Sequence, residues 1–119
     1  MVWKPHGILD QALVNEIVAF LEAAEERSQK PFNRFADLSA LDAVDLNFSF
    51  VFHIALHRRL TFESHPPVKT AFYVRSPASA HYAKLLAMLT DHSPLHVSLF
   101  TERAAAAMWL GVPVEALRV

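Results

Sequence analysis

Polar side chains of the kinds that bind ligands or take part in catalysis follow apolar, strand-like runs at three places in the chain. Asp37 and Ser39 follow the first run, Ser76 and Ser79 the second, and Arg103 the third. Because the carboxyl ends of parallel strands meet at one edge of a sheet, we expect these side chains to lie close together. Hydroxyl groups at a helix N-terminus, beside an arginine, suit a small anionic ligand or an acidic side chain of a partner. Helix capping by Ser76 with solvated arginines is the simpler interpretation, and the sequence leaves both open.

An acidic segment before the second predicted helix extends the same edge. Residues 35–46 end an apolar run, pass through Asp42 and Asp45 and enter a helical pattern. This order is typical of a functional loop at the carboxyl edge of an α/β sheet, with Asp45 capping the helix that follows. The candidate edge for a ligand or partner therefore comprises Asp37, Ser39, Asp42, Asp45, Ser76, Ser79 and Arg103.

Covalent catalysis finds little support in the sequence. The chain has no cysteine, which excludes disulfides, thiolate nucleophiles and Cys-ligated zinc. Three serines lie near predicted strand ends and His81 follows the last of them. However, two glycines in the whole chain are too few for a G-x-S-x-G elbow or a phosphate-binding loop. We therefore predict no catalytic residues, with a hydrolase as the third-ranked hypothesis.

The histidines invite a metal site but lack its full ligand set. His53 and His57 stand four residues apart, so they share one face of a helix and could chelate one ion. No third ligand with suitable spacing lies nearby in the sequence. We therefore predict no metal and no cofactor, and we assign the histidines to the surface or to an interface. The stripe that mixes them with apolar residues is typical of a subunit contact: Leu46, Phe50, His53 and His57.

Composition indicates a single small domain, residues 1–119, with one core. Apolar residues make up 53% of the chain and charged residues 19%, so we expect a second subunit or a ligand to cover some apolar surface. The net charge of −1, with basic residues dispersed along the chain, disfavours nucleic-acid binding. No apolar run approaches the length of a membrane span and no signal-peptide core is present, so we expect a cytoplasmic protein.

Hydrophobic periodicity predicts alternating helices and strands. Helical spacing, with capping or breaking residues at its ends, predicts helices at 10–27, 45–60, 77–91 and 102–110. Strand patterns occur at 32–37, 68–74 and 95–100, the last as an edge strand, and residues 1–5 are expected to form a short first strand before a turn at His6 and Gly7. The fold class is therefore α/β, with about four strands in a largely parallel or mixed sheet and roughly four helices.

Three sequence segments, taken together and in this order, suggest a family resemblance. They are residues 35–39 before a helix, the strand-like residues 68–74, and residues 99–111 with their alanine-rich helix. Together they resemble the SpoIIAA-like branch of the STAS/SEC14-type small bacterial α/β proteins. The resemblance implies a compact domain in which helices wrap a small sheet. The members that gave the branch its name are anti-sigma-factor antagonists, switched by a kinase at a serine. In segment 42–45 of this chain, Val44 occupies the position of that serine, so the phospho-switch is not implied here.

The residues and the resemblance together predict a non-catalytic regulatory or protein-interaction module that forms a homodimer. The resemblance also implies an alternative function, because SEC14-type relatives bind lipids in an apolar cavity. Aromatic residues make up 11% of this chain and could line such a cavity, although a core or a dimer interface accounts better for most of them. The alternative is therefore a carrier of a small apolar ligand or lipid.

Overall fold

The main sheet consists of four parallel strands. The computed structural model describes residues 1–28 and 30–118. The strands lie in the order β1-β3-β5-β6, with β1 at Val2–Trp3, β3 at Arg34–Asp37, β5 at Val68–Tyr73 and β6 at Leu95–Phe100. One row of aligned residues crosses the whole sheet: Trp3, Ala36, Phe72 and Leu99. These pairings confirm the predicted α/β class, the short strand within residues 1–5 and the edge position of the last strand.

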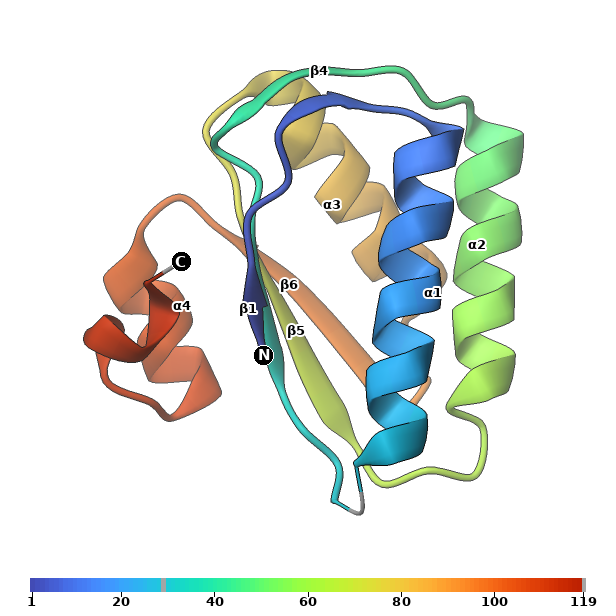
Figure 1. Ribbon diagram of the computed structural model, residues 1–119, viewed down its shortest axis with the longest axis vertical. Coiled ribbons are helices and arrows are strands. Elements are labelled where there is room, and N and C mark those ends of the chain that lie inside the picture. Colours follow the sequence, from blue (N-terminus) through green and yellow to red (C-terminus); the bar gives the residue numbers. More distant parts are fainter. Residues whose placement is uncertain (29, 119) are drawn as a thin grey trace.

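Helices cover both faces of this sheet (Figure 1). On one face lie α1 at Gln11–Arg27, α2 at Phe48–Thr61 and α3 at Pro77–Leu89, and on the other lie α4 at Arg103–Leu110 and the 3-10 helix η1 at Val114–Leu117. Successive side chains along each strand point to opposite faces of the sheet, so each strand contributes to both sides of the core. Ala36 and Phe72 pack in the layer under α2 and α3, whereas Phe35 and Tyr73 pack against α4.

Local capping signals place most helix ends where the sequence predicts them. The Asp10 carboxylate accepts a hydrogen bond from the Leu13 amide and starts α1, and Ser76 caps α3 in the same way, with Pro77 in the first turn. At the end of α4, Gly111 adopts a left-handed conformation with φ of 73°. Helix α3 ends at Leu89, two residues earlier than predicted, and the chain then turns through His92, which has a φ of 63°.

A second, two-stranded sheet is absent from the sequence-based prediction. Strand β2, Gly7–Leu9, pairs in parallel with β4, Leu41–Val44. The predicted turn at His6 and Gly7 and the predicted loop between Asp37 and Asp45 are therefore wrong in part. Gly7, with φ of 82°, redirects the chain into β2. Strands of three and four residues carry too little alternation to be recognised from periodicity alone.

Helix α2 begins at Phe48, and Asp45 does not cap it as predicted. The Asn47 side-chain oxygen accepts a hydrogen bond from the Phe50 amide at 2.8 Å, so Asn47 is the cap. The Asp45 amide donates instead to the Leu9 carbonyl at 2.8 Å. This bond extends the pairing of β2 with β4, so Asp45 is held in extended backbone before the helix starts.

The buried face of α2 differs in part from the prediction. Helical spacing predicts an apolar face of Phe48, Val51, Phe52, Ala55 and Leu56. The structure buries Val51 and Ala55, together with Ile54 and Arg58, and leaves the other three exposed. Helix α2 carries apolar side chains on both its buried and its exposed side, so its periodicity does not indicate which side faces inward. Among the residues that the structure describes, no helix is both long and apolar enough to cross a membrane.

Candidate functional site

Three of the predicted site residues meet at the carboxyl edge of the main sheet. Asp37, the last residue of β3, is 1% exposed. One oxygen of its carboxylate accepts hydrogen bonds from the Ser39 amide at 2.9 Å and from the Ser39 hydroxyl at 2.5 Å. The other oxygen accepts a hydrogen bond from the Arg103 guanidinium at 2.6 Å. The expected convergence of Asp37, Ser39 and Arg103 is therefore confirmed as geometry, while a role in binding stays a prediction.

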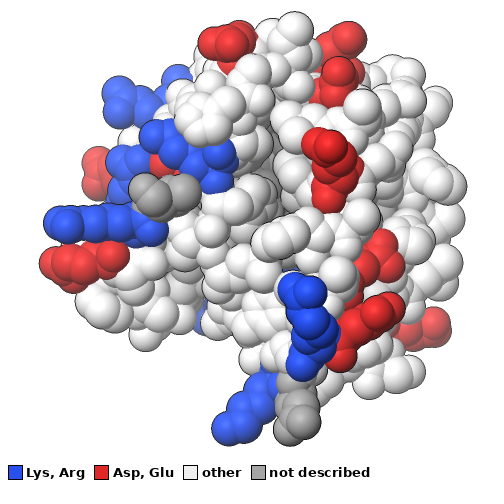
Figure 2. All heavy atoms as spheres, viewed as in Figure 1, with Lys and Arg blue, Asp and Glu red and all other residues white. Residues whose placement is uncertain are grey.

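The Arg103 guanidinium makes a second contact that fixes its position. It lies over the Tyr73 ring, 4.4 Å from the ring centroid. Arg75 approaches the same tyrosine and is 3.4 Å from its hydroxyl oxygen. Basic side chains gather on the side of the molecule that α4 occupies, at the left of Figure 2. The cation that the sequence offers for ligand binding is thus engaged with an internal carboxylate and an aromatic ring.

The environment keeps Asp37 ionised. Burial alone would raise the pKa of this carboxyl, but the two Ser39 hydrogen bonds and the Arg103 ion pair together lower the pKa below its ordinary value of 3.8. Three donors already occupy the carboxylate. Asp37 is therefore suited to joining β3 to α4, and it has little capacity left for proton transfer or ligand binding.

The hydroxyl of Ser76 serves local structure at the start of α3. The Ser76 hydroxyl oxygen accepts a hydrogen bond from the Ser79 amide at 3.1 Å, and the Ser79 side chain is buried. Asp42 is exposed on β4. Asp45 lies beside Asp10 and Asn47, where α1 and α2 begin. In the described part of the chain, no hydrogen bond or ion pair links these residues to Asp37.

In the part of the chain that the structure describes, the serines and histidines make separate contacts. The Ser39 hydroxyl donates to Asp37, and within residues 1–28 and 30–118 no hydrogen bond joins a serine to His81. His53 is exposed, and His57 pairs with Glu22 on α1 at 3.0 Å. Across those same residues, no group of three or more His, Cys, Asp or Glu side chains is placed to hold a metal ion.

The sequence analysis missed a charged cluster at the opposite, amino-terminal edge of the sheet. Glu25 of α1 accepts hydrogen bonds from Arg34 of β3 at 2.5 Å and from Arg58 of α2 at 2.6 Å. Side-chain exposures of 2% for Arg34 and 6% for Arg58 show that both arginines are buried. An available signal is the position of Arg58 on the face of α2 that also carries Val51 and Ile54. A charge there implies a buried partner.

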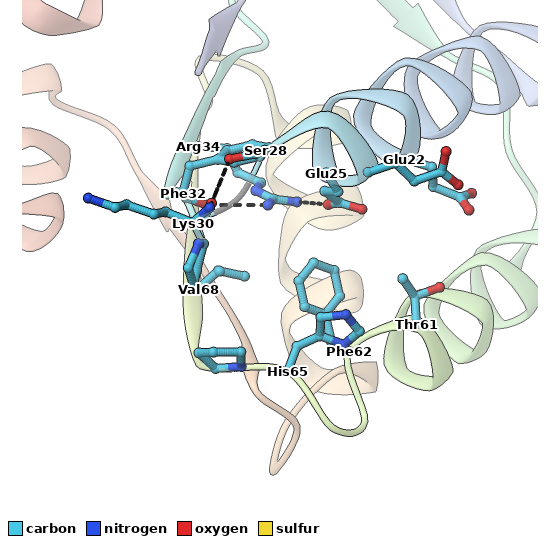
Figure 3. A pocket seen from close by; sticks show the side chains of 13 residues that line it. Glu22, Glu25, Ser28, Lys30, Phe32, Arg34, Thr61, Phe62, His65 and Val68 are labelled. Atoms are coloured by element: carbon cyan, nitrogen blue, oxygen red, sulfur yellow. Dashed lines mark hydrogen bonds and ion pairs between the residues drawn. The ribbon is translucent and has the colours of Figure 1, made fainter.

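Two members of this cluster, Glu25 and Arg34, line an open pocket of about 390 Å³. Figure 3 shows the Arg34 guanidinium extending from β3 towards Glu25, with Phe62 and His65 on the opposite side of the hollow. The Arg34 guanidinium is 4.6 Å from the centroid of the Phe32 ring and 5.4 Å from that of Phe62.

The two arginines also set the charge of Glu25. Burial acts to raise the pKa of Glu25, but hydrogen bonds from Arg58 and Arg34 lower this pKa below its ordinary value of 4.5. The glutamate is therefore ionised.

A smaller cavity lies inside the core, between the sheet and helices α1, α2 and α3. Its volume is about 70 Å³ and its lining is mainly apolar, with Leu9, Val14, Ile54 and Phe72 among the lining residues. Tyr82 also lines it, and burial raises the pKa of the Tyr82 hydroxyl to about 12. This hydroxyl therefore stays protonated at neutral pH.

Comparison with known proteins identifies the fold. No protein-family model matches this chain, and no curated protein matches it. A solved structure does match: an uncharacterized protein of the DUF3478 family with a SpoIIAA-like fold, from Shewanella loihica PV-4. The TM-score is 0.56 at 17% sequence identity, and the match covers 90% of this chain and 80% of that one. An identity this low shows the fold alone. The resemblance that the sequence suggested is confirmed at that level: this chain has a SpoIIAA-like fold.

Proposed function

We propose that this protein is a single-domain, non-catalytic regulatory or protein-interaction module that forms a homodimer through α2. One observation supports this proposal above the others. Four large apolar side chains follow one another at four-residue intervals along α2 and remain exposed: Phe48 at 59%, Phe52 at 50%, Leu56 at 46% and Leu60 at 61%. We call these four residues the α2 stripe. Contiguous exposed apolar surface of this kind marks interaction sites.

The surroundings of the stripe also suit a contact with another protein. In α2, every residue of which the structure describes, the exposed positions include no Lys, Arg, Asp or Glu. The rings of Phe48 and Phe52 stack on each other with centroids 6.1 Å apart, which gives one end of the stripe a fixed shape. Absence of charge at the centre of a surface is typical of the core of an interface.

The spacing of the stripe is compatible with two-fold symmetry. If α2 packs antiparallel on α2 of a second copy, Phe48 faces Leu60 of the partner subunit and Phe52 faces Leu56 of the partner subunit. Both contacts then occur twice, as an isologous interface requires. The helix has 14 residues and is about 21 Å long, so the stripe spans most of its length.

Area arguments predict a weak dimer. Full burial of a Phe or Leu side chain contributes about 1.5–3 kcal/mol, so covering the exposed half of each contributes about 1 kcal/mol. Four side chains from each subunit then give roughly 8 kcal/mol, against an association cost of roughly 4–15 kcal/mol. At the lower limit of that cost the net gain is about 4 kcal/mol, so a dissociation constant of about 1 mM or weaker follows, unless residues beside the stripe add contacts.

Analytical ultracentrifugation over a wide concentration range tests the proposal. The native chain should shift from monomer to dimer as concentration rises, and Phe52→Glu should remain monomeric. The matched control is Met108→Glu, at an exposed apolar position on the opposite face of the sheet, which should dimerise like the native chain. Combining Phe52→Lys with Leu56→Glu should give stronger association than Phe52→Lys alone, because antiparallel packing places opposite charges across the interface. A native chain that is monomeric throughout, or loss of the dimer in the control, contradicts the proposal.

The phospho-switch of the sporulation proteins is not part of this proposal. Val44 ends β4 and its neighbours in segment 42–45 include no hydroxyl side chain. Incubation with a protein kinase and ATP should therefore leave this segment unmodified in a phosphopeptide map. Phosphate on Ser39 would show that a switch exists at a neighbouring position.

The inner cavity supports a second candidate function, a carrier of a small apolar ligand or lipid. Its volume of about 70 Å³ corresponds to roughly two water molecules, so a lipid could enter only if α1 or α2 moved away from the sheet. Native mass spectrometry of the purified protein separates the two functions. A retained small molecule supports the carrier, whereas a mass equal to that of the chain alone contradicts it.

A further inference from the structure

The pocket at the amino-terminal edge of the sheet combines buried charge with apolar walls. Residues from α1, β3 and the segment between α2 and β5 line its volume of about 390 Å³. Small-molecule sites in proteins typically measure about 300–1,000 Å³. The pocket has room for about a dozen water molecules, so an organic ligand of similar atom count fits.

The buried charges beside this pocket do not balance. Arg34 and Arg58 share a single carboxylate, that of Glu25, which leaves one positive charge in excess. Each of these side chains is at most 17% exposed. An uncompensated charge in a poorly solvated place is unfavourable, and an anion bound nearby would relieve it.

Arg34 also retains unused hydrogen-bond donors. Its two terminal nitrogens donate to Glu25 and to the Phe32 carbonyl, which engages two of the five N–H groups of a guanidinium. Its Nε is buried without a partner, and it is the one such side-chain atom in residues 1–28 and 30–118. A buried donor without an acceptor is rare in folded proteins and calls for an explanation.

The walls of the pocket indicate the rest of the ligand. The rings of Phe32 and Phe62 flank the Arg34 guanidinium, and Val68 and Pro66 add apolar surface. Guanidinium groups bind carboxylates through paired hydrogen bonds, and aromatic walls favour an apolar body. We propose that this pocket binds a small organic monocarboxylate with an apolar, preferably aromatic, body. The carboxylate accepts hydrogen bonds from Arg34, and the body lies against Phe62 and Val68.

Acidic side chains at the pocket mouth should limit the affinity. Glu22 and Glu26 line the mouth. Glu22 pairs with His57, whereas Glu26 is exposed and makes no ion pair in the described part of the chain. Glu26 therefore repels an incoming anion, and its replacement by a cation should strengthen binding.

Titration with hydrocinnamate, followed by amide chemical shifts in two-dimensional NMR, tests the proposal. Saturable shifts should appear at Phe32, Phe62 and Val68, with a dissociation constant in the millimolar range, as expected for a ligand of about eleven heavy atoms. Hydrocinnamyl alcohol keeps the ring and chain but lacks the carboxylate, so it should bind at least about tenfold more weakly. Equal binding of acid and alcohol, or no saturable shift with the acid, overturns the proposal.

Two charge variants on the same helix make the test specific. Glu26→Lys should tighten hydrocinnamate binding by about two- to fivefold. Glu16→Lys changes the net charge equally at an exposed position of α1 outside the pocket lining, so it should leave the affinity unchanged. An equal gain in both variants would show a general charge effect and contradict the site.

A third variant tests the donor itself. Arg34→Lys keeps a positive charge but removes the planar donor pair, and it should abolish saturable binding. Because Arg34 is buried, the circular dichroism spectrum and melting temperature of this variant are measured first. If this variant does not fold, the comparison of acid with alcohol and the comparison of Glu26→Lys with Glu16→Lys still test the site.

The pocket does not depend on the α2 stripe. Phe52→Glu should bind hydrocinnamate with native affinity even if it fails to dimerise.

Discussion

Replacing Arg103 with methionine would measure how strongly the carboxyl edge of the sheet is engaged in holding the fold together. Methionine keeps much of the aliphatic length but removes the guanidinium. The change leaves Asp37, which is 1% exposed, with its two hydrogen bonds from Ser39 and without a cation. It also removes the cation that lies over the Tyr73 ring at 4.4 Å.

The expected cost lies between two limits. Removing one partner of a fully buried ion pair costs about 3–5 kcal/mol, whereas exposed pairs contribute about 0–1 kcal/mol. The Arg103 side chain is 42% exposed, so solvent screens part of the interaction. We expect a loss of about 2 kcal/mol in the free energy of unfolding. For a chain of 119 residues, this corresponds to a melting temperature lower by about 8 °C.

Urea unfolding of four proteins provides the assay: the native chain, Arg103→Met, Asp37→Asn and the double variant. A coupling energy of about 1–2 kcal/mol between the two positions is expected from a double-mutant cycle. Arg75→Met is the control, because Arg75 is exposed and its one side-chain hydrogen bond within residues 1–28 and 30–118 is to the Tyr73 hydroxyl, at 3.4 Å. It should change stability by less than about 0.5 kcal/mol. If Arg103→Met costs no more than the control, the guanidinium is available to a ligand and our interpretation of this edge is refuted.

Two further predictions concern local structure and acid stability. Asn47→Ala should lower the free energy of unfolding by about 1 kcal/mol, while Asp45→Ala should change it by less than about 0.5 kcal/mol; the reverse order in urea titrations would restore Asp45 as the cap of α2. In the folded state the pKa values of Asp37 and Glu25 lie below their ordinary values of 3.8 and 4.5. The two ionised carboxylates therefore stabilise the fold fully at any pH above the ordinary values. This stabilisation is lost as the pH falls through the lower pKa values of the folded state. Urea midpoints should therefore fall between about pH 5 and about pH 3, and less so in Asp37→Asn; a flat profile in the native chain would contradict this.

Elements with strong local signals could be predicted from the sequence. Ser76 and Pro77 predict the start of α3, because a side-chain cap and a fixed φ act within one helical turn. Gly111 predicts the end of α4, because glycine readily adopts the left-handed conformation found there. The alternation of helix and strand then implies a parallel sheet, and with it the meeting of Asp37 and Arg103, which lie 66 residues apart. The helix-capping residues and the rule that alternating helices and strands form a parallel sheet were therefore enough to predict that Asp37 and Arg103 meet.

Features that depend on competition between distant segments could not be predicted. Strand β4 forms because β2 is available to pair with it, and this pairing holds Asp45 out of α2. The orientation of α2 depends on its packing partners, because apolar side chains lie on both its buried and its exposed side. The burial of Arg34 and Arg58 follows from that orientation and from Glu25 on a third element. In each case the deciding partner is remote in the sequence and leaves no periodic signal.

The distribution of unsatisfied groups argues for a division of roles between the two edges of the sheet. Ligands of open parallel sheets usually bind beyond the carboxyl ends of the strands, where Asp37 and Arg103 lie. Here a ligand could reach the Asp37 carboxylate only by displacing hydrogen bonds from Ser39 and Arg103. At the amino-terminal edge the Nε of Arg34 is buried without a partner, so an acceptor that reached it would compete with no existing hydrogen bond of that atom. The fold alone therefore favours a ligand at the carboxyl edge, but the unsatisfied buried donor of this particular chain lies at the opposite edge.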